Sequence, residues 1–264
     1  LAYFLTNHFE YPWFMLALTL ITFISFVDDI RSTSQALRLV FHFSAMALMF
    51  YQWGLFSLSW WTILVALIIC TGIINAYNFM DGINGITGGY SLVVLGALAY
   101  VNTKITAFVE ADFIYTSLCA VLVFNFFNFR KRATCFAGDV GSVSIAFIVL
   151  FLIGKLIIKT GDFSWIILLV VYGVDSVLTI IHRLMLHENI GLPHRKHLYQ
   201  IMANELKVPH VVVSSVYMAV QALVIVGYFY FQEYNYWYLL GSILILSGTY
   251  ILFMKKYFRL HFLI

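Results

Sequence analysis

Long apolar runs separated by short polar segments dominate the chain. We count nine such runs, each close to the roughly 20 apolar residues that a helix needs to cross the hydrocarbon core of a bilayer. They cover residues 11–27, 36–53, 56–75, 86–102, 108–129, 142–159, 163–181, 210–231 and 236–254. The runs are continuous and do not alternate with polar positions, which favours helices over the strands of a β-barrel. The pattern predicts an all-α, polytopic transmembrane bundle of about nine helices, with residues 1–264 forming a single integral-membrane domain.

Composition supports a membrane protein and excludes several other classes. Of the 264 residues, 62% are hydrophobic and only 10% are charged, and the mean hydropathy is +0.93. A soluble domain has about 25% charged residues. The net charge of +3 is too small to indicate a nucleic-acid partner. The three cysteines are far apart in the sequence and indicate neither a disulfide framework nor a zinc site.

Positive residues are distributed unevenly between the two sides of the predicted bundle. Twelve of the fifteen Lys and Arg residues fall in the segments after the first, third, fifth and seventh helices and in the C-terminal tail, where they are Lys255, Lys256 and Arg259. Because positive residues stay on the cytoplasmic side of a membrane, these segments and the C-terminus are expected to face the cytosol. The longest polar stretch, about 182–209, then becomes a cytosolic loop rich in histidine.

Carboxylates collect at helix ends on the same predicted side. They are Asp28 and Asp29 after the first run, Asp81 after the third, and Asp139 before the sixth. If they converge in the bundle they repel one another, and a divalent cation would relieve that repulsion. Oxygen ligands without cysteine suit Mg²⁺ or Mn²⁺. Since Mg²⁺ leaves coordination positions open for phosphate oxygens, the cluster predicts a phosphorylated substrate.

Each of these signals also has a structural interpretation. Asp28 and Asp29 are equally explained as a helix cap in the headgroup region. Asp175 lies inside an apolar helix, which indicates function by default, so it is a candidate substrate contact. A pair with Arg183 or with a polar group of a neighbouring helix explains it as well. The acids also leave open a secondary transporter with an intramembrane acid relay. Finally, the N–H groups of the helix that follows "GDVGS" are suited to hold an anion.

Four polar segments, taken together, resemble a known enzyme family. They are "FVDDIRSTSQALRL", "NAYNFMDGINGITGG", "FAGDVGS" and "PHRKHLYQ". Their order and spacing resemble those of the polyprenyl-phosphate N-acetylhexosamine-1-phosphate transferases, which include the initiators of O-antigen and enterobacterial common antigen and phospho-N-acetylmuramoyl-pentapeptide translocase. Members usually have ten or eleven helices, so the resemblance implies two more helices upstream of this chain.

The resemblance implies a reaction and its partners. A polyprenyl phosphate such as undecaprenyl phosphate attacks the β-phosphate of a UDP-sugar, a polyprenyl-diphosphate-sugar forms, and UMP leaves. The expected cofactor is Mg²⁺, with Mn²⁺ as a substitute. The expected location is the bacterial inner membrane, with the active site on the cytosolic face, and the expected role is the first step of lipopolysaccharide or related cell-envelope glycan synthesis. A homodimer is compatible with the sequence, which leaves the oligomeric state open.

The family motifs imply roles for the acidic segments. Asp28 and Asp29 match the aspartate pair, one member of which is proposed to orient the lipid phosphate or to take its proton. Asp139 matches the Mg²⁺ ligand. Asn78 and Asp81 match positions near the nucleotide diphosphate and the metal.

The remaining motif residues are basic or amide side chains. The resemblance places His194 and His197 close to the sugar phosphate, and it makes Arg38 and Arg195 candidate phosphate contacts. Asn128 is a candidate nucleotide contact, but "RKRAT" replaces a proline-containing segment at this point and leaves that contact open. The translocase carries consecutive histidines where this chain has "HRKH", which argues against a muramoyl-pentapeptide donor. An N-acetylhexosamine or 6-deoxy donor fits better, although no motif identifies the sugar.

Overall fold

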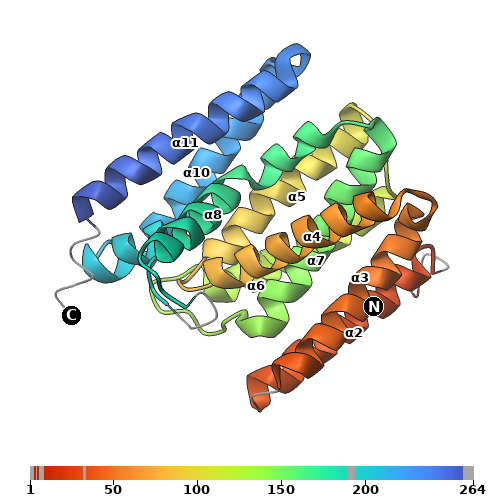
Figure 1. Ribbon diagram of the computed structural model, residues 1–264, viewed down its shortest axis with the longest axis horizontal. Coiled ribbons are helices and arrows are strands. Elements are labelled where there is room, and N and C mark those ends of the chain that lie inside the picture. The colour runs from red at the N-terminus through yellow and green to blue at the C-terminus, as the bar shows by residue number, and fades with distance from the viewer. Residues whose placement is uncertain (1–2, 4, 6–8, 32–33, 190–193, 258–264) are drawn as a thin grey trace.

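The computed structural model is helical throughout the part of the chain that it describes (Figure 1). It describes all residues except 1–2, 4, 6–8, 32–33, 190–193 and 258–264, so Pro193 of the histidine motif and Arg259 of the basic tail lie outside the described residues. The long helices are α2 (Pro12–Ile30), α3 (Gln35–Trp53), α4 (Trp60–Met80), α5 (Ile86–Lys104), α6 (Ala111–Asn128), α7 (Gly138–Thr160), α8 (Val170–Met185), α10 (His210–Tyr230) and α11 (Asn235–Tyr257). Short elements are three 3₁₀ turns (Leu55–Ser57, Phe163–Leu169 and Gln232–Tyr234), α9 (Leu198–Gln200) and a π-helical turn (Ile201–Glu205).

The described helices confirm the predicted polytopic bundle. Eight of them, α8 being counted together with the 3₁₀ turn before it, are long and apolar enough to cross a membrane. The ninth predicted helix is α3, whose apolar run is interrupted by Arg38, His42 and Gln52. It begins where the side chain of Ser34 accepts a hydrogen bond from the Leu37 N–H, a normal helix N-cap.

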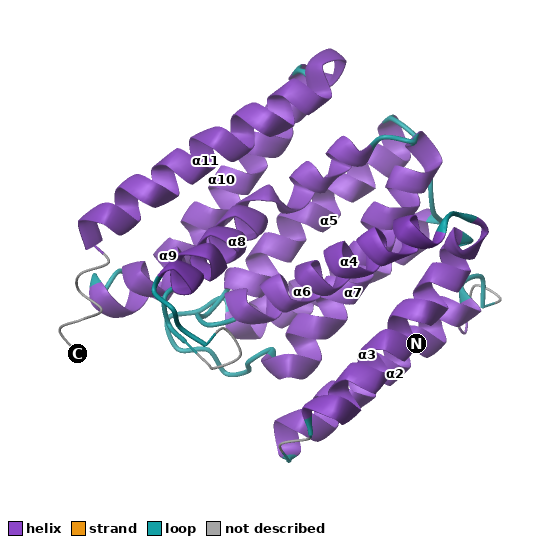
Figure 2. Cartoon of the chain, in the orientation of Figure 1, coloured by secondary structure: helices purple, strands orange, loops and turns teal. Residues whose placement is uncertain are grey.

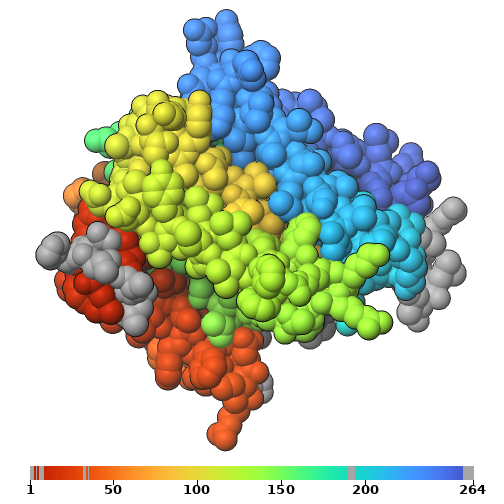
Figure 3. All heavy atoms as spheres, turned by 180° about the vertical axis from the view of Figure 1, so that it is seen from behind, coloured from red at the N-terminus to blue at the C-terminus, as the bar shows by residue number. Residues whose placement is uncertain are grey.

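The helices are arranged in three groups (Figure 1). The α2–α3 hairpin lies on one side, the α10–α11 hairpin lies on the other, and α4 to α8 lie between them. Of the spans, α5, α7 and the one ending in α8 are the most buried. Aromatic stacking joins α2 to the central group, where the rings of Phe14 and Phe151 on α7 lie 4.1 Å apart. Within the central group, the rings of Tyr90 on α5 and Tyr172 on α8 lie 3.6 Å apart. The view from behind shows α5 and α6 between the N-terminal helices and the blue C-terminal hairpin (Figure 3).

The loops that carry the four polar segments gather at one end of the bundle (Figure 2). There α2, α4, α6 and α8 end, and α5, α7 and α10 begin. Two helix boundaries differ from the expected ones. Helix α4 continues to Met80, beyond the predicted end at residue 75, and α7 begins at Gly138, before the predicted start at residue 142. Asn78 and Asp139 are therefore held on helices, which fix their positions more firmly than a loop would.

Candidate functional site

Arg38 joins acidic residues from two different helices. Its Nη1 lies 3.0 Å from Asp28 Oδ2, at the end of α2, and its Nη2 lies 3.4 Å from Asp139 Oδ2, in the first turn of α7. The two nitrogens of a planar guanidinium can serve two carboxylates at once, which a lysine ammonium cannot do with the same geometry. The structure therefore brings these three sequence-predicted residues together.

Asp29 caps the N-terminus of α7. Its Oδ1 accepts a hydrogen bond from the Asp139 N–H at 3.2 Å, and its Oδ2 accepts one from the Val140 N–H at 3.1 Å. Gly138 adopts a φ of +61°, and a Cβ there would lie 2.8 Å from Asp29 Oδ2, so glycine permits this approach. The α7 N–H groups that we expected to hold an anion thus hold the carboxylate of Asp29. This cap is formed by residues about 110 positions apart, and no signal in the sequence points to it.

Asp81 lies in the turn between α4 and α5, close to the same cluster. The hydroxyl of Thr87 donates a hydrogen bond to Asp81 Oδ1 at 2.6 Å. Burial raises the pKa of Asp81 to about 6, against the effect of the Thr87 hydrogen bond and with help from the negative charges of Asp139 and Asp29. Burial and nearby negative charges both disfavour the ionised form of a carboxyl, and Asp81 is subject to both. Thr87 was not among the predicted site residues, because a threonine after a glycine-rich turn is not distinctive.

Two asparagines brace this region. Asn78 Oδ1 accepts a hydrogen bond from the hydroxyl of Ser142 at 2.7 Å, which ties α4 to α7. The buried Asn128 accepts a hydrogen bond from the Gly85 N–H at 2.7 Å and donates one to the Cys135 carbonyl at 2.8 Å. Asn128 therefore uses its amide to hold the α4–α5 turn against the segment after α6.

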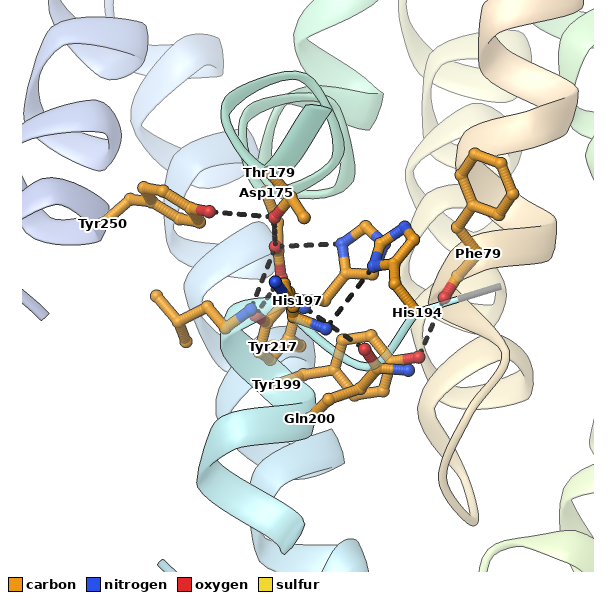
Figure 4. A network of polar contacts seen from close by, with 11 residues as sticks. Phe79, Asp175, Thr179, His194, His197, Tyr199, Gln200, Tyr217 and Tyr250 are labelled. Atoms are coloured by element: carbon orange, nitrogen blue, oxygen red, sulfur yellow. Dashed lines mark hydrogen bonds and ion pairs between the residues drawn. The ribbon is translucent and has the colours of Figure 1, made fainter. Parts of the chain in front are cut away.

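The histidine segment packs against the end of α4 (Figure 4). The rings of His194 and His197 lie 4.9 Å apart, and the ring of Phe79 lies 6.0 Å from the first and 6.2 Å from the second. The hydroxyl of Tyr199 donates a hydrogen bond to the Phe79 carbonyl at 2.8 Å. Arg195 is exposed, and no hydrogen bond or ion pair joins it to another described residue.

The two histidines have different surroundings. His194 is partly exposed, and its pKa is lowered to about 4 by burial first and then by the nearby His197 and Arg183. It is therefore neutral near pH 7 and suited to hydrogen bonding. His197 is 1% exposed, and its Nδ1 lies 3.3 Å from Oδ1 of the buried Asp175. Of the structural alternatives for Asp175, the structure shows a polar group of a neighbouring helix, the Tyr217 hydroxyl on α10, while Arg183 pairs with Glu188.

The residues of the acidic cluster fit a hard divalent cation. Asp28, Asp29, Asp81 and Asp139 supply oxygen donors only, and the charges of Asp139 and Asp29 add to burial in raising the pKa of Asp81. Among the described residues there is no group of three or more His, Cys, Asp or Glu side chains that could together hold a metal ion. Sites that act on phosphates typically hold Mg²⁺ through one or two carboxylates and let substrate oxygens complete the shell, so the donor set agrees with that kind of site.

Comparison with known proteins identifies the family. The model for Glycosyl transferase family 4 matches residues 11–157, which is more than half of the chain. The chain belongs to glycosyl transferase family 4. The match covers α2 to α7, and with them every residue of the acidic cluster, while the histidine segment lies beyond it.

Individual family-4 relatives agree on the kind of reaction and differ in their substrates. A Bacillus subtilis protein named "Probable undecaprenyl-phosphate N-acetylglucosaminyl 1-phosphate transferase" is 28% identical over 149 residues, which is 54% of this chain and 41% of that protein. A phospho-N-acetylmuramoyl-pentapeptide-transferase of Lactiplantibacillus plantarum is 32% identical over 103 residues, 38% of this chain and 31% of that protein. The chain thus matches less than half the length of either relative.

Proposed function

We propose that this family-4 protein transfers an N-acetylhexosamine 1-phosphate, or that of a 6-deoxy relative, from a UDP-sugar to a polyprenyl phosphate and releases UMP. The observation that carries the proposal is the meeting of Asp28, Asp139 and Arg38 from three helices, next to the raised-pKa Asp81, at one end of a membrane-spanning bundle. Charged groups at the end of the bundle face both a soluble nucleotide and the headgroup of a lipid, which are the two substrates of such a reaction.

Phosphoryl transfer depends on positioning and charge neutralisation more than on covalent chemistry from the protein. Arg38 is placed to neutralise phosphate oxygens while it holds Asp28 and Asp139 at a fixed separation. Asp29 is engaged by two backbone N–H groups of α7, and Asp28 is paired with Arg38, whose cation would also attract the lipid phosphate. Asp28 is therefore the member of the pair that we propose to orient the lipid phosphate. A monoester phosphate with a second pKa near 6 is largely ionised at pH 7, so a strong base in the protein is not required.

Asp139 is the proposed metal ligand, with Asp81 and Asn78 nearby. A bound Mg²⁺ would supply charge stabilisation at the diphosphate and help UMP leave. His194 and His197 form the other wall of the proposed site, next to Phe79, where they would contact the sugar phosphate. Arg195 is exposed and free of described partners, as a candidate phosphate contact would be.

The proposed orientation follows the charge distribution. Lys196, Arg183, Arg38 and the cationic run after α6 lie at the same end of the bundle as the acidic cluster, and positive residues stay cytoplasmic. We place the site at the cytosolic face of a bacterial inner membrane, where the product would begin a cell-surface glycan. Two observations argue against the alternative of a transporter. The chain belongs to a family of glycosyl transferases. Asp175, the acid on which the alternative depended, contacts His197 and does not stand alone in the bundle.

The test is UMP release by the purified protein in detergent with undecaprenyl phosphate, Mg²⁺ and a panel of UDP-N-acetylhexosamines, followed by mass spectrometry of the lipid product. Asp139→Asn and chelation by EDTA are each expected to abolish release. Arg38→Lys is expected to retain more activity than Arg38→Gln, because it keeps the charge and loses the two-carboxylate contact. Equal rates for the wild type and Asp139→Asn, with and without EDTA, would refute the proposal.

A further inference from the structure

Asp175, on α8, is buried and surrounded by hydrogen-bond donors (Figure 4). Its side chain is 4% exposed. Oδ1 lies 3.3 Å from His197 Nδ1 and accepts hydrogen bonds from the Leu198 N–H at 3.2 Å and the Thr179 hydroxyl at 3.2 Å, while Oδ2 accepts one from the Tyr217 hydroxyl at 2.6 Å. Because a carboxylate only accepts hydrogen bonds, the contact between Nδ1 and Oδ1 is a hydrogen bond when Nδ1 carries the proton.

The other ring nitrogen of His197 has no such partner. His197 is 1% exposed, its Nε2 is fully buried, and no described residue forms a hydrogen bond with it. A buried polar atom without a partner costs about 1–3 kcal/mol. The segment that carries the ring also lines the proposed sugar-phosphate wall, beside His194 and Phe79. The ring is therefore satisfied on the Asp175 side and unsatisfied on the other side.

We propose that Asp175 is a positioning residue that fixes the ring of His197 with Nδ1–H directed to α8, so that Nε2 is the ring atom offered to the substrate. The proposal rests on the proposed function for the identity of the substrate. A neutral ring would accept a hydrogen bond at Nε2 from a substrate hydroxyl or amide, and a charged ring would donate Nε2–H to a phosphate oxygen. With Nδ1 protonated in both the neutral and the charged ring, any proton exchanged at the site is exchanged at Nε2. Asp175 itself touches no substrate in this arrangement.

The partners of Asp175 come from several helices, which makes its position rigid. Asp175 and Thr179 lie on α8, Tyr217 lies on α10, and the Thr179 hydroxyl is 2.9 Å from the hydroxyl of Tyr250 on α11. The C-terminal hairpin, which lies beyond the family match, thus supports the histidine through a chain of hydrogen bonds. A simple brace between helices would use the same contacts, so the experiment has to observe the imidazole ring itself.

The first arm measures the ring directly. Protein with ¹⁵N-labelled histidine is studied by NMR at a pH well above the ordinary histidine pKa, and the His197 signal is assigned by its loss in His197→Gln. We expect the Nδ1–H tautomer in the wild type. In Asp175→Asn the amide can donate to Nδ1, and we expect a change to the Nε2–H tautomer. This arm needs no substrate, so it remains decisive if the wild type fails to release UMP, which would refute the proposed function alone.

The second arm measures catalysis. Asp175→Asn is expected to lower kcat about 100-fold or more, with a much smaller change in KM, because a misplaced group slows the chemical step. Tyr217→Phe removes a single donor to Asp175 and is expected to lower kcat about tenfold or less. The matched controls lie at the opposite end of the bundle: Tyr228→Phe, a buried tyrosine also on α10, and Asp162→Asn, a carboxylate that accepts hydrogen bonds from Ser164 and Asn235. Both are expected to keep the wild-type kcat.

The outcomes separate a positioning role from a structural one. A changed His197 tautomer together with a fall in kcat for Asp175→Asn, and unchanged kcat in the controls, supports the proposal. An unchanged tautomer in Asp175→Asn overturns it, as does an unchanged kcat in an active enzyme. If Asp175→Asn does not fold, Tyr217→Phe decides: a lowered kcat at an unchanged unfolding temperature supports the proposal, and a lowered unfolding temperature with kcat unchanged per folded molecule overturns it.

Discussion

Replacing Asp81 by asparagine is expected to stabilise the metal-free protein at neutral pH. The change keeps the size of the side chain and an oxygen that accepts the Thr87 hydrogen bond, and it removes the negative charge from the crowded cluster. The ionised form of Asp81 is disfavoured in the folded protein, because burial, together with the charges of Asp139 and Asp29, raises the pKa of Asp81 from 3.8 to about 6. Activity should fall at the same time, since Asp81 lies beside the proposed metal ligand.

The size of the effect follows from the shift in the pKa of Asp81. A difference of about two pKa units corresponds to roughly 3 kcal/mol at 1.36 kcal/mol per unit. Because Asp81 keeps partial exposure to solvent, which screens its neighbours, we expect about 1–3 kcal/mol. By the usual size relation this is roughly 2 to 10 °C in the unfolding midpoint.

The sign fixes the pH window. Between pH about 4 and about 6 the folded protein holds the Asp81 proton while the unfolded chain has released it, so the folded state binds more protons and loses stability as the pH rises. The asparagine variant has no such loss. The two proteins should therefore unfold at similar temperatures near pH 4, and the variant should gain its full advantage above pH about 6.

The assay is thermal unfolding of the purified protein in detergent, followed by tryptophan fluorescence over a pH series with EDTA present. Adding Mg²⁺ should raise the midpoint of the wild type more than that of the variant, because the cation favours the ionised carboxylate. Midpoints of the two proteins that run parallel from pH 4 to pH about 8 in EDTA would refute the reasoning.

Asp162→Asn is a control of opposite sign. Burial alone would raise the pKa of Asp162, but hydrogen bonds from Ser164 and Asn235 outweigh burial and lower it. Its charge therefore stabilises the folded protein above the unfolded pKa, and that stability is lost as the pH falls through the folded value. Removing the charge should destabilise the protein at neutral pH, where removing that of Asp81 stabilises it.

Two glycine substitutions test the close approaches in the site. Gly138→Ala is expected to lower both the unfolding temperature and UMP release, because it strains a residue at φ +61° and drives a Cβ against Asp29 Oδ2. The expected cost is about 1–3 kcal/mol. The control is Gly96→Ala, which has open space around its Cβ and is expected to be neutral or stabilising by up to about 1 kcal/mol in the same scans. Gly82→Ala places a Cβ against the Tyr199 hydroxyl and should lower kcat by displacing the histidine segment, and an unchanged kcat would contradict the link between the two halves of the site.

The spans and their polar ends were predictable because lipid imposes a simple rule. A backbone that crosses hydrocarbon must satisfy its own hydrogen bonds, so each long apolar run becomes a helix and polar residues mark its end. The rule is less exact where polar side chains continue on a helix. The sequence predicts that the third helix ends at residue 75, which places Asn78 in a loop. Helix α4 continues to Met80, and the Asn78 side chain is satisfied on the helix because it accepts a hydrogen bond from Ser142 on α7.

The partners of the site residues were not predictable in the same way. Asp29 and the α7 backbone are distant in sequence, as are Asp175 and Tyr217, and the pattern of one segment carries no information about which residue faces it. Tyr217 is one of 17 tyrosines in an aromatic-rich chain, so its type gave no signal. The sequence indicates which residues are chemically active, and only packing shows which of them hold the others in place.

The α4–α5 turn joins the acidic cluster to the histidine segment. Phe79, at the end of α4, accepts the Tyr199 hydrogen bond through its carbonyl and lies against both histidine rings, and Asp81 follows two residues later beside the acidic cluster. Gly82 leaves room for the Tyr199 ring on the same turn. Because a single short segment contacts both groups, a shift of the turn that moves one group must also move the other. The separation between the metal-binding side and the sugar-phosphate side of the proposed site is therefore set by the backbone of four residues, 79–82, which explains why Asp81 and Gly82 follow directly on the apolar end of α4.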